Sequence, residues 1–281
     1  MKNILNLDDK SLSSEDIKIL NERILCWYEV IHLHYLITRK TCRREFAIMS
    51  SNDMMRRTFR VHNTQSFQYI FRNWDIINKF KRGKGLDKFY RSVAYYIKGV
   101  PYGNPDLSTN IQSKIWLSEN IKDMAGYDLF IDIDANDHLD FDRAKESMQL
   151  IHKFFLKINL PHEINFSGRG FHVIVPYEYL PKLSFDPEDK NSIYDYCLKK
   201  AKYLFDNFTE LVDTCVYDSK RLMKCPYTLA LYGKDLYVCK PLTNEEIIYN
   251  CKLDDFIPEN VFIEQGYKLF YDLNREVKIW E

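Results

Sequence analysis

The chain lacks several features that would assign it to a class at once. Its 40 Lys and Arg residues are balanced by 40 Asp and Glu residues, so the net charge is zero and bulk charge does not indicate a nucleic-acid partner. The seven cysteines are odd in number and include no CxxC pair. This argues against a disulfide framework and favours a reducing cytoplasm.

Long apolar runs are also missing. No stretch of about 18 apolar residues occurs, and the N-terminal MKNILNLDDK contains no apolar signal core. We therefore expect a soluble, cytoplasmic protein without a membrane partner. The GxxxxGK[ST] pattern of a P-loop is absent as well, which excludes that route to nucleotide binding.

The 281 residues, 46 % of them hydrophobic, suffice for a sizeable core. Apolar periodicity predicts helices first, including 53–82 and 86–98, with a loop at 99–106. The second half predicts strands at 127–134, around the turn at 167–170, at 211–217 and at 227–240. Helices are expected after 140, with a buried stripe ending at Ile158, and over 191–208.

This order predicts an α+β fold in one domain over 1–281. A helical or mixed part at 1–110 would precede an RRM-like β-α-β-β-α-β part at 111–281, with the active site between them.

Three short segments suit a metal-dependent nucleotidyl-transfer site. They are FIDID at 130–134, SGRGFH at 167–172, and LVD at 211–213 followed by KRLMK at 220–224. Asp132 and Asp134 are two residues apart on a predicted strand and so share a face. Carboxylates in such an arrangement can hold Mg²⁺, and glycine-flanked or clustered basic residues can hold a triphosphate.

Each segment alone also has an ordinary structural interpretation. A DxD can be an exposed strand end, SGRG a hairpin turn with a solvated Arg169, and KRLMK a solvated basic turn. His172 taken alone is better explained as a histidine at the edge of the core. The order of the three segments is what favours a single site.

That order resembles the archaeo-eukaryotic primase superfamily. Its first motif matches Asp132 and Asp134, its second matches Ser167 to His172, and its apolar-Asp motif matches Asp213. Primase small subunits are also resembled by two further segments, the REF segment that begins at Arg44 and the sequence that follows Asp213. The resemblance therefore spans roughly residues 40–240.

The resemblance implies synthesis and extension of primers on single-stranded DNA from NTP or dNTP, with two Mg²⁺ or Mn²⁺ ions. It implies Asp132, Asp134 and Asp213 as metal ligands and catalytic residues. It also implies a set of nucleotide-binding residues. Together with the other residues of the basic run, these are Ser167, Arg169, His172, Lys224, Arg44, Arg221 and Lys220.

Two departures from the family pattern bear on subtype. The Ser-Leu-His-Gly-Lys run of the small subunits is replaced by a longer TLALYGK at 228–234 that lacks the His. The zinc module is also missing: Cys26, His32, His34 and Cys42 are its nearest candidates, and two histidines two apart on a helix do not face together. We therefore expect no zinc.

Two subtypes fit a zinc-free core. One is a mobile-element or CRISPR-associated primase–polymerase, whose partners would be CRISPR machinery or an accessory subunit. The other is a replicative small subunit without its zinc module, and we favour the first.

Basic and aromatic residues alternate in the first third of the chain, which suits a track for the phosphate backbone of a template and primer strand. The basic residues predicted to contact nucleic acid are Arg56, Arg57, Arg60, Lys81, Arg82 and Lys84. For any single cluster, a solvated helix face remains the simpler alternative.

Two other functions compete with the primase interpretation. A DxD glycosyltransferase would share the paired carboxylates but gives no reason for SGRGFH or KRLMK. A catalytically weak, primase-like subunit that only binds nucleic acid would share the fold, but the presence of all three carboxylates argues against it.

Overall fold

The computed structural model describes residues 44–49, 55–61, 88–97, 121–135, 140–226, 228–232, 235–243 and 245–261. The strands in these ranges are β1 (Arg44–Met49), β2 (Met55–Val61), β3 (Lys88–Tyr96), β4 (Met124–Tyr127), β5 (Leu129–Ile133), β6 (Glu163–Phe166), β7 (Phe171–Val175), β8 (Leu222–Lys224), β9 (Leu229–Tyr232), β10 (Asp235–Val238) and β11 (Pro241–Leu242). The helices are α5 (Phe141–Lys157), α6 (Ile193–Asn207), α7 (Glu245–Asn250) and α8 (Pro258–Val261), with short 3₁₀ turns at Tyr177–Tyr179 and Leu253–Phe256. No helix in the described ranges has the length and apolar character needed to cross a bilayer.

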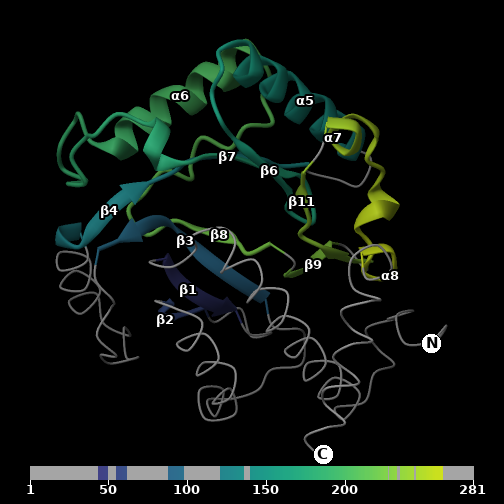
Figure 1. The fold of residues 1–281 in the computed structure, drawn as a ribbon, viewed down its shortest axis with the longest axis horizontal. Coiled ribbons are helices and arrows are strands. Elements are labelled where there is room, and N and C mark those ends of the chain that lie inside the picture. The colour runs from purple at the N-terminus through teal and green to yellow at the C-terminus, as the bar shows by residue number, and fades with distance from the viewer. Residues whose placement is uncertain are drawn as a thin grey trace, which may run out of the picture.

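The strands form two antiparallel sheets and a hairpin. The first sheet has the order β2-β1-β3-β4, and β8 also pairs with β3. The second sheet has the order β11-β6-β7-β5, and β9 pairs with β10. In Figure 1 the second sheet lies between the first sheet and the helices α5 and α6, so the described core is built in three layers.

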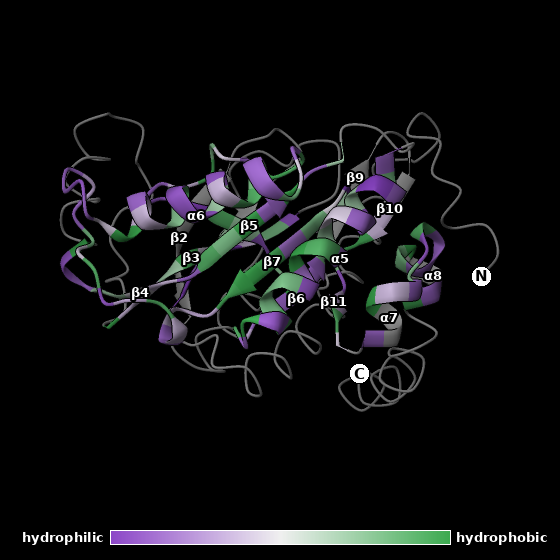
Figure 2. Ribbon diagram, turned by 90° about the horizontal axis from the view of Figure 1, so that it is seen from above, coloured by the Kyte–Doolittle hydropathy of each residue, from purple (hydrophilic) through white to green (hydrophobic). Residues whose placement is uncertain are grey.

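Strand alternation explains why helices cover one face of the second sheet. Ile131 and Ile133 on β5, with Phe171 and Val173 on β7, are fully buried and alternate with residues of the other face. Figure 2 shows α5 and α6 above these hydrophobic strands. Each fully buried apolar side chain of this layer contributes about 1.5–3 kcal/mol to stability.

Helix α5 presents a matching stripe to that layer. Its buried positions include Ala144, Met148, Ile151 and Phe155, spaced by three or four residues, as the sequence predicts. Ile158 was expected to extend the stripe, but it caps the helix and is half exposed. The stripe therefore ends one turn earlier than predicted.

Several predicted elements differ in the structure. The region 53–82, predicted helical, contains strand β2, and 86–98, also predicted helical, is strand β3. Strand β3 lies between β1 on one side and β4 and β8 on the other, and its residues 91–94 are buried consecutively, without a period of two. A central strand of this kind cannot be distinguished from a buried helix by periodicity.

The predicted strand at 211–217 is also wrong in extent. It is irregular apart from a single antiparallel bridge between Val212 and Ile133. The strand predicted over 227–240 is instead the β9–β10 hairpin. The first five elements of the predicted β-α-β-β-α-β order occur as β5, α5, β6, β7 and α6, which makes the described fold mixed α and β with antiparallel sheets. The RRM-like assignment stays a prediction, and the predicted loop at 99–106 lies outside the described residues.

The predicted strand at 127–134 divides at Asp128, where the chain passes from the first sheet to the second. Asp128 and Arg44 are 1 % and 4 % exposed and form a buried ion pair. Asp128 also accepts a hydrogen bond from the Tyr177 amide at 3.0 Å. Arg44 also donates to the carbonyls of Ser92 at 2.6 Å and Val93 at 3.0 Å. The pair thus joins β1, β3, the crossover and the chain after β7.

We expect Asp128→Asn to destabilise the fold by about 3–5 kcal/mol, because it leaves the Arg44 charge buried without its counter-charge. The measurement is the free energy of unfolding in urea. The control is Glu210→Gln, which breaks the exposed Arg143–Glu210 pair and should cost less than about 1 kcal/mol. Equal effects of the two substitutions would show that the buried pair has no special structural role.

Candidate active site

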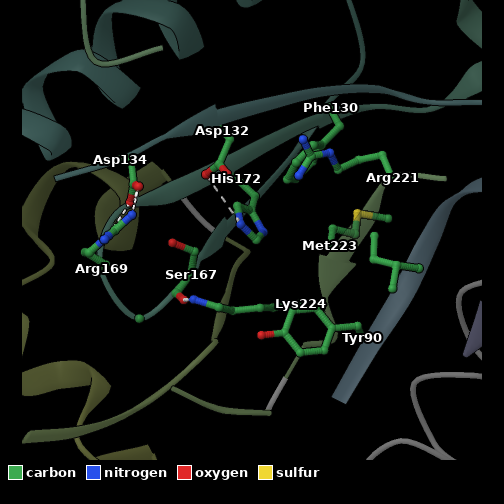
Figure 3. Close-up of a pocket in the computed structure, with 12 residues that line it drawn as sticks. Tyr90, Phe130, Asp132, Asp134, Ser167, Arg169, His172, Arg221, Met223 and Lys224 are labelled. Atoms are coloured by element: carbon green, nitrogen blue, oxygen red, sulfur yellow. Dashed lines mark hydrogen bonds and ion pairs between the residues drawn. The ribbon is translucent and has the colours of Figure 1, made fainter. Parts of the chain in front are cut away.

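A cavity of about 270 Å³ lies between the two sheets and brings together residues of the first two sequence motifs and of the basic run of the third, whereas Asp213 is not among the residues that line it. Figure 3 shows the second sheet contributing one wall and strands β3 and β8 contributing the other. The residues lining it are Tyr90, Phe130, Asp132, Asp134, Ser167, Gly168, Arg169, His172, Arg221, Leu222, Met223 and Lys224.

The two carboxylates of the first motif occupy different surroundings. Asp132 is on β5, where the strand register places it directly opposite His172 on β7. Asp134 follows the end of β5, and its amide donates to the carbonyl of Leu211 at 3.1 Å. Both line the cavity, but Asp134 lies next to the 167–170 turn, whereas Asp132 lies within β5 beside His172.

The third carboxylate, Asp213, is placed beside Asp132 by the backbone. The bridge between Ile133 and Val212 is antiparallel, so the next residue pair in register is Asp132 and Asp213. The Asp213 amide donates to the Asp132 carbonyl at 2.8 Å, which is consistent with this register. Residues opposite one another in an antiparallel pair project to the same face, with Cβ atoms about 5 Å apart.

Asp218, the other candidate for the third carboxylate, serves the following turn. Its side chain accepts a hydrogen bond from the Lys220 amide at 2.7 Å, and its carbonyl accepts one from the Tyr127 hydroxyl at 2.9 Å. Its carboxylate lies 3.7 Å from Arg221. Asp218 is thus placed as a brace of the basic run, whereas Asp213 is placed next to Asp132.

Electrostatics distinguish Asp132 from its neighbours. Burial raises its pKa to about 6; Lys224 acts in the opposite direction, and the charge of Asp213 adds to the rise. The pKa of His172 is held well below its ordinary value, first by burial and then by the charges of Lys224 and Arg91. The imidazole is therefore neutral at pH 7, and its Nε2 lies 3.6 Å from Asp132 Oδ1, beyond hydrogen-bond reach. Asp132 is not neutralised by this histidine.

The SGRG turn fits its position only because it contains glycine. Gly168 has φ of 97°, and a Cβ there would lie 2.1 Å from the Cβ of Ala230. A Cβ on Gly170 would lie 1.9 Å from the carbonyl oxygen of Ile133. The turn is closed by hydrogen bonds between Ser167 and Gly170 in both directions, at 2.9 and 3.2 Å. It is thus packed against the end of β5, with Arg169 at its tip.

Arg169 contacts the first motif directly. Its Nε donates to Asp134 Oδ1 at 2.6 Å, and its Nη2 contacts the other carboxylate oxygen, so the pair is bidentate (Figure 3). Lys224 on β8 reaches the same turn and donates from Nζ to the Ser167 carbonyl at 2.6 Å. The acidic and basic groups predicted for one site therefore meet here.

Arg221 lines the cavity but is engaged with the backbone. Its Nε donates to the Val216 carbonyl at 2.8 Å and its Nη2 to the Cys215 carbonyl at 3.1 Å. The Cys215 amide in turn donates to Asp213 Oδ1 at 2.7 Å. Arg221 thus fixes the turn that follows Asp213.

Other predicted residues lie elsewhere. Arg44 is held in the buried pair with Asp128 and does not line the cavity, and Lys220 is next to the cavity wall without forming part of it. Arg56, Arg57 and Arg60 lie on β2, at the edge of the first sheet. Lys81, Arg82 and Lys84, and the cysteines and histidines considered for zinc, fall outside the described residues.

Sequence reasoning missed the apolar wall of the cavity. Tyr90 comes from β3, which was predicted as a helix, so no pattern could place it here. Phe130 had a usable signal, because it precedes Asp132 by two residues and shares its face; its ring meets that of His172 edge-on at 4.7 Å. Leu222 and Met223 are apolar residues within the basic run.

The carboxylates fit a divalent cation in part. Asp132 and Asp213 supply the hard oxygen atoms that Mg²⁺ or Mn²⁺ prefers, and the raised pKa of Asp132 marks a buried charge that a cation would stabilise. Asp134 is instead turned to Arg169. Across the described residues, no three His, Cys, Asp or Glu side chains converge as a ready metal-binding group.

Comparisons with known proteins identify the fold. No protein-family model and no curated protein sequence matches the chain. A solved structure of the polymerase domain of ligase D from Mycobacterium tuberculosis, in complex with DNA, is similar with a TM-score of 0.50 and 11 % sequence identity. The similarity covers 92 % of this chain and 91 % of that one. At this identity the likeness concerns the fold alone.

Asp132 should make stability depend on pH in a defined direction. Its folded pKa of about 6 lies above the ordinary value of 3.8, so the folded state holds the proton more tightly than the unfolded chain. Wild-type stability should therefore fall relative to Asp132→Asn as the pH rises from about 4 to about 6, by on the order of 2–3 kcal/mol. The measurement is urea unfolding of both proteins in buffer with EDTA. A wild-type stability that stays constant or rises relative to that of Asp132→Asn over this range would contradict the assignment.

Proposed function

We propose that the chain is a metal-dependent nucleotidyltransferase of the archaeo-eukaryotic primase superfamily that extends primers on a single-stranded DNA template. One observation carries this proposal. The carboxylates of Asp132 and Asp134 line the same cavity as the SGRG turn and Lys224, and Asp213 lies opposite Asp132 in the bridged segment. A site for cation-assisted phosphoryl transfer needs these two groups close together.

The acidic side would hold the cation. Asp132 and Asp213 lie opposite one another on adjacent chain segments and would be its first ligands, with Asp134 at the mouth of the cavity as the third. A divalent cation bound there would favour attack by a primer 3′-hydroxyl and stabilise the charge on the leaving pyrophosphate.

The basic side would hold the triphosphate. Lys224 projects from β8 toward the turn and supplies a fixed positive charge. Arg169 offers a guanidinium fork, which suits phosphate oxygens. His172 is neutral and would donate a hydrogen bond from a ring N–H, and Ser167 would donate from its hydroxyl. Arg221 would act through the backbone by fixing the turn that carries Asp213.

Two features of the fold support the superfamily assignment. The similar structure is a polymerase domain in complex with DNA. In addition, the order β6-β7-β5, extended on the far side of β5 by the Val212 bridge, is compatible with an RRM-like module. The pairing of β8 with β3 joins the parts before and after residue 110 in one sheet, which supports a single domain over 1–281.

The template would follow the basic first third of the chain. Arg56, Arg57 and Arg60 lie on β2 at an edge of the first sheet and would supply positive charge for a phosphate backbone. We further propose that the chain works with an accessory subunit or CRISPR machinery rather than in replication.

Primer synthesis on circular single-stranded DNA with Mg²⁺ or Mn²⁺, comparing NTP with dNTP, tests the activity itself. Glycosyl transfer, or DNA binding without incorporation, would favour the competing functions.

Asp213 and Asp218 provide a matched pair for testing the acidic side. Asp213→Asn should lower nucleotide incorporation at least about a hundredfold, because the side chain keeps its shape but loses the charge that would hold the cation. Asp218→Asn should keep most of the activity, since Asp218 braces a turn. The measurement is incorporation of labelled nucleotide on a primed template, with circular dichroism to confirm folding. The reverse ranking of the two variants would shift the third motif to Asp218.

A further inference from the structure

The ion pair between Arg169 and Asp134 joins a residue proposed to bind triphosphate to a residue proposed to bind the cation. The guanidinium contacts both carboxylate oxygens, with Nε to Oδ1 at 2.6 Å. The pair lies at the mouth of the cavity, where the side chains of Arg169 and Asp134 are 44 % and 30 % exposed. While the pair is intact, Asp134 presents its oxygen atoms to Arg169, and Arg169 presents its fork to Asp134.

We propose that Arg169 couples cation binding to nucleotide binding by exchanging partners. With the cavity empty, Arg169 neutralises Asp134. When a cation takes Asp134, the guanidinium is released to the triphosphate, and when a triphosphate takes Arg169, the carboxylate is released to the cation. This inference rests on the proposed nucleotidyltransferase function and adds to it how the two ligands depend on each other.

The surroundings allow this exchange without movement of the backbone. The turn that carries Arg169 is closed by its own Ser167–Gly170 hydrogen bonds and is packed through its glycines against Ile133 and Ala230. Asp134 is anchored by its amide to Leu211. The exchange requires new torsion angles in these two partly exposed side chains. Lys224 differs, because it bonds the turn's own backbone.

The free-energy consequence is positive cooperativity. A cation binding alone must separate the pair and leaves the guanidinium without its carboxylate, and a triphosphate binding alone must do the same from the other side. When both bind, the pair is separated once and each charged group gains a new partner. By linkage, each ligand then raises the affinity for the other by the same factor.

Binding of Mn²⁺ alone tests one half of the exchange. The free Mn²⁺ signal in electron paramagnetic resonance gives its affinity without nucleotide for wild type, Arg169→Ala, Asp134→Asn and the double variant. Removing Arg169 should tighten Mn²⁺ binding about threefold or more, the range expected for a partly exposed ion pair. In the Asp134→Asn background the same removal should have little effect, because no pair remains to be separated.

The other half uses nucleotide alone, in EDTA. Asp134→Asn should tighten dNTP binding about threefold when Arg169 is present, and should have little effect in Arg169→Ala. Arg169→Lys keeps the charge but loses the fork, so it should behave between wild type and Arg169→Ala.

The cycle separates the exchange from simple charge repulsion. If Arg169→Ala tightens Mn²⁺ equally in both backgrounds, the effect is long-range repulsion and the proposal is overturned. It is also overturned if Arg169→Ala leaves Mn²⁺ affinity unchanged or weakens it. If the four proteins show no interaction between Arg169 and Asp134 but the wild type still incorporates nucleotide, the proposed coupling is wrong and the proposed function is unaffected. If none of the four proteins binds Mn²⁺ and no nucleotide is incorporated, both the coupling and the proposed function are wrong.

Discussion

The buried ion pair between Arg44 and Asp128 is the constraint on which the rest of the structure depends. Asp128 stands where the chain leaves the first sheet at β4 and enters the second at β5. Arg44 reaches it from β1 and also bonds two carbonyls of β3, while Asp128 accepts the amide of Tyr177 after β7. Both charges are removed from water, so each requires the other. The pair therefore ties the first sheet to the point at which the chain enters the second, and the cavity lies between these two sheets.

The cavity depends on the stacking because its two walls come from different sheets. The carboxylates, the SGRG turn and His172 belong to the second sheet or its ends, whereas Lys224 and Tyr90 lie directly opposite each other on β8 and β3 of the first. Lys224 then crosses to the Ser167 carbonyl. The electrostatic environment of Asp132 and His172, both of which sense Lys224, is thus created by the packing of the two sheets rather than by either alone.

The sequence predicted the strands of the second sheet and the helices that cover it, and it missed most of the first sheet. Helices α5 and α6 carry helical periodicity because one side of each meets the core, and strands β5, β6 and β7 are short, mostly apolar segments next to turn residues. Strand β3 is flanked on both edges and buried over consecutive residues, so its pattern resembled a helix, and Tyr90 was lost with it. The proximity of Asp132 and Asp213 could be anticipated only from a family resemblance, since a single bridge at Val212 creates it.

Arg44 was associated with the nucleotide because its motif adjoins the site in the family. Its partner Asp128 is 84 residues away, and no local pattern could show that contact.

The two carboxylates of the DxD motif, although only two residues apart, are not equivalent. Asp132 is enclosed by strands, lacks a charged partner in His172, and has its pKa raised to about 6. Asp134 lies at the mouth and is neutralised by Arg169. A positive charge entering the cavity would therefore gain most from Asp132, where the effect of burial exceeds the attraction of Lys224, and would compete with Arg169 at Asp134. Asp132 would therefore attract the cation first, whereas Asp134 would have to exchange Arg169 for it. The difference arises from one residue step past the end of β5, which moves Asp134 from between strands to the reach of the SGRG turn.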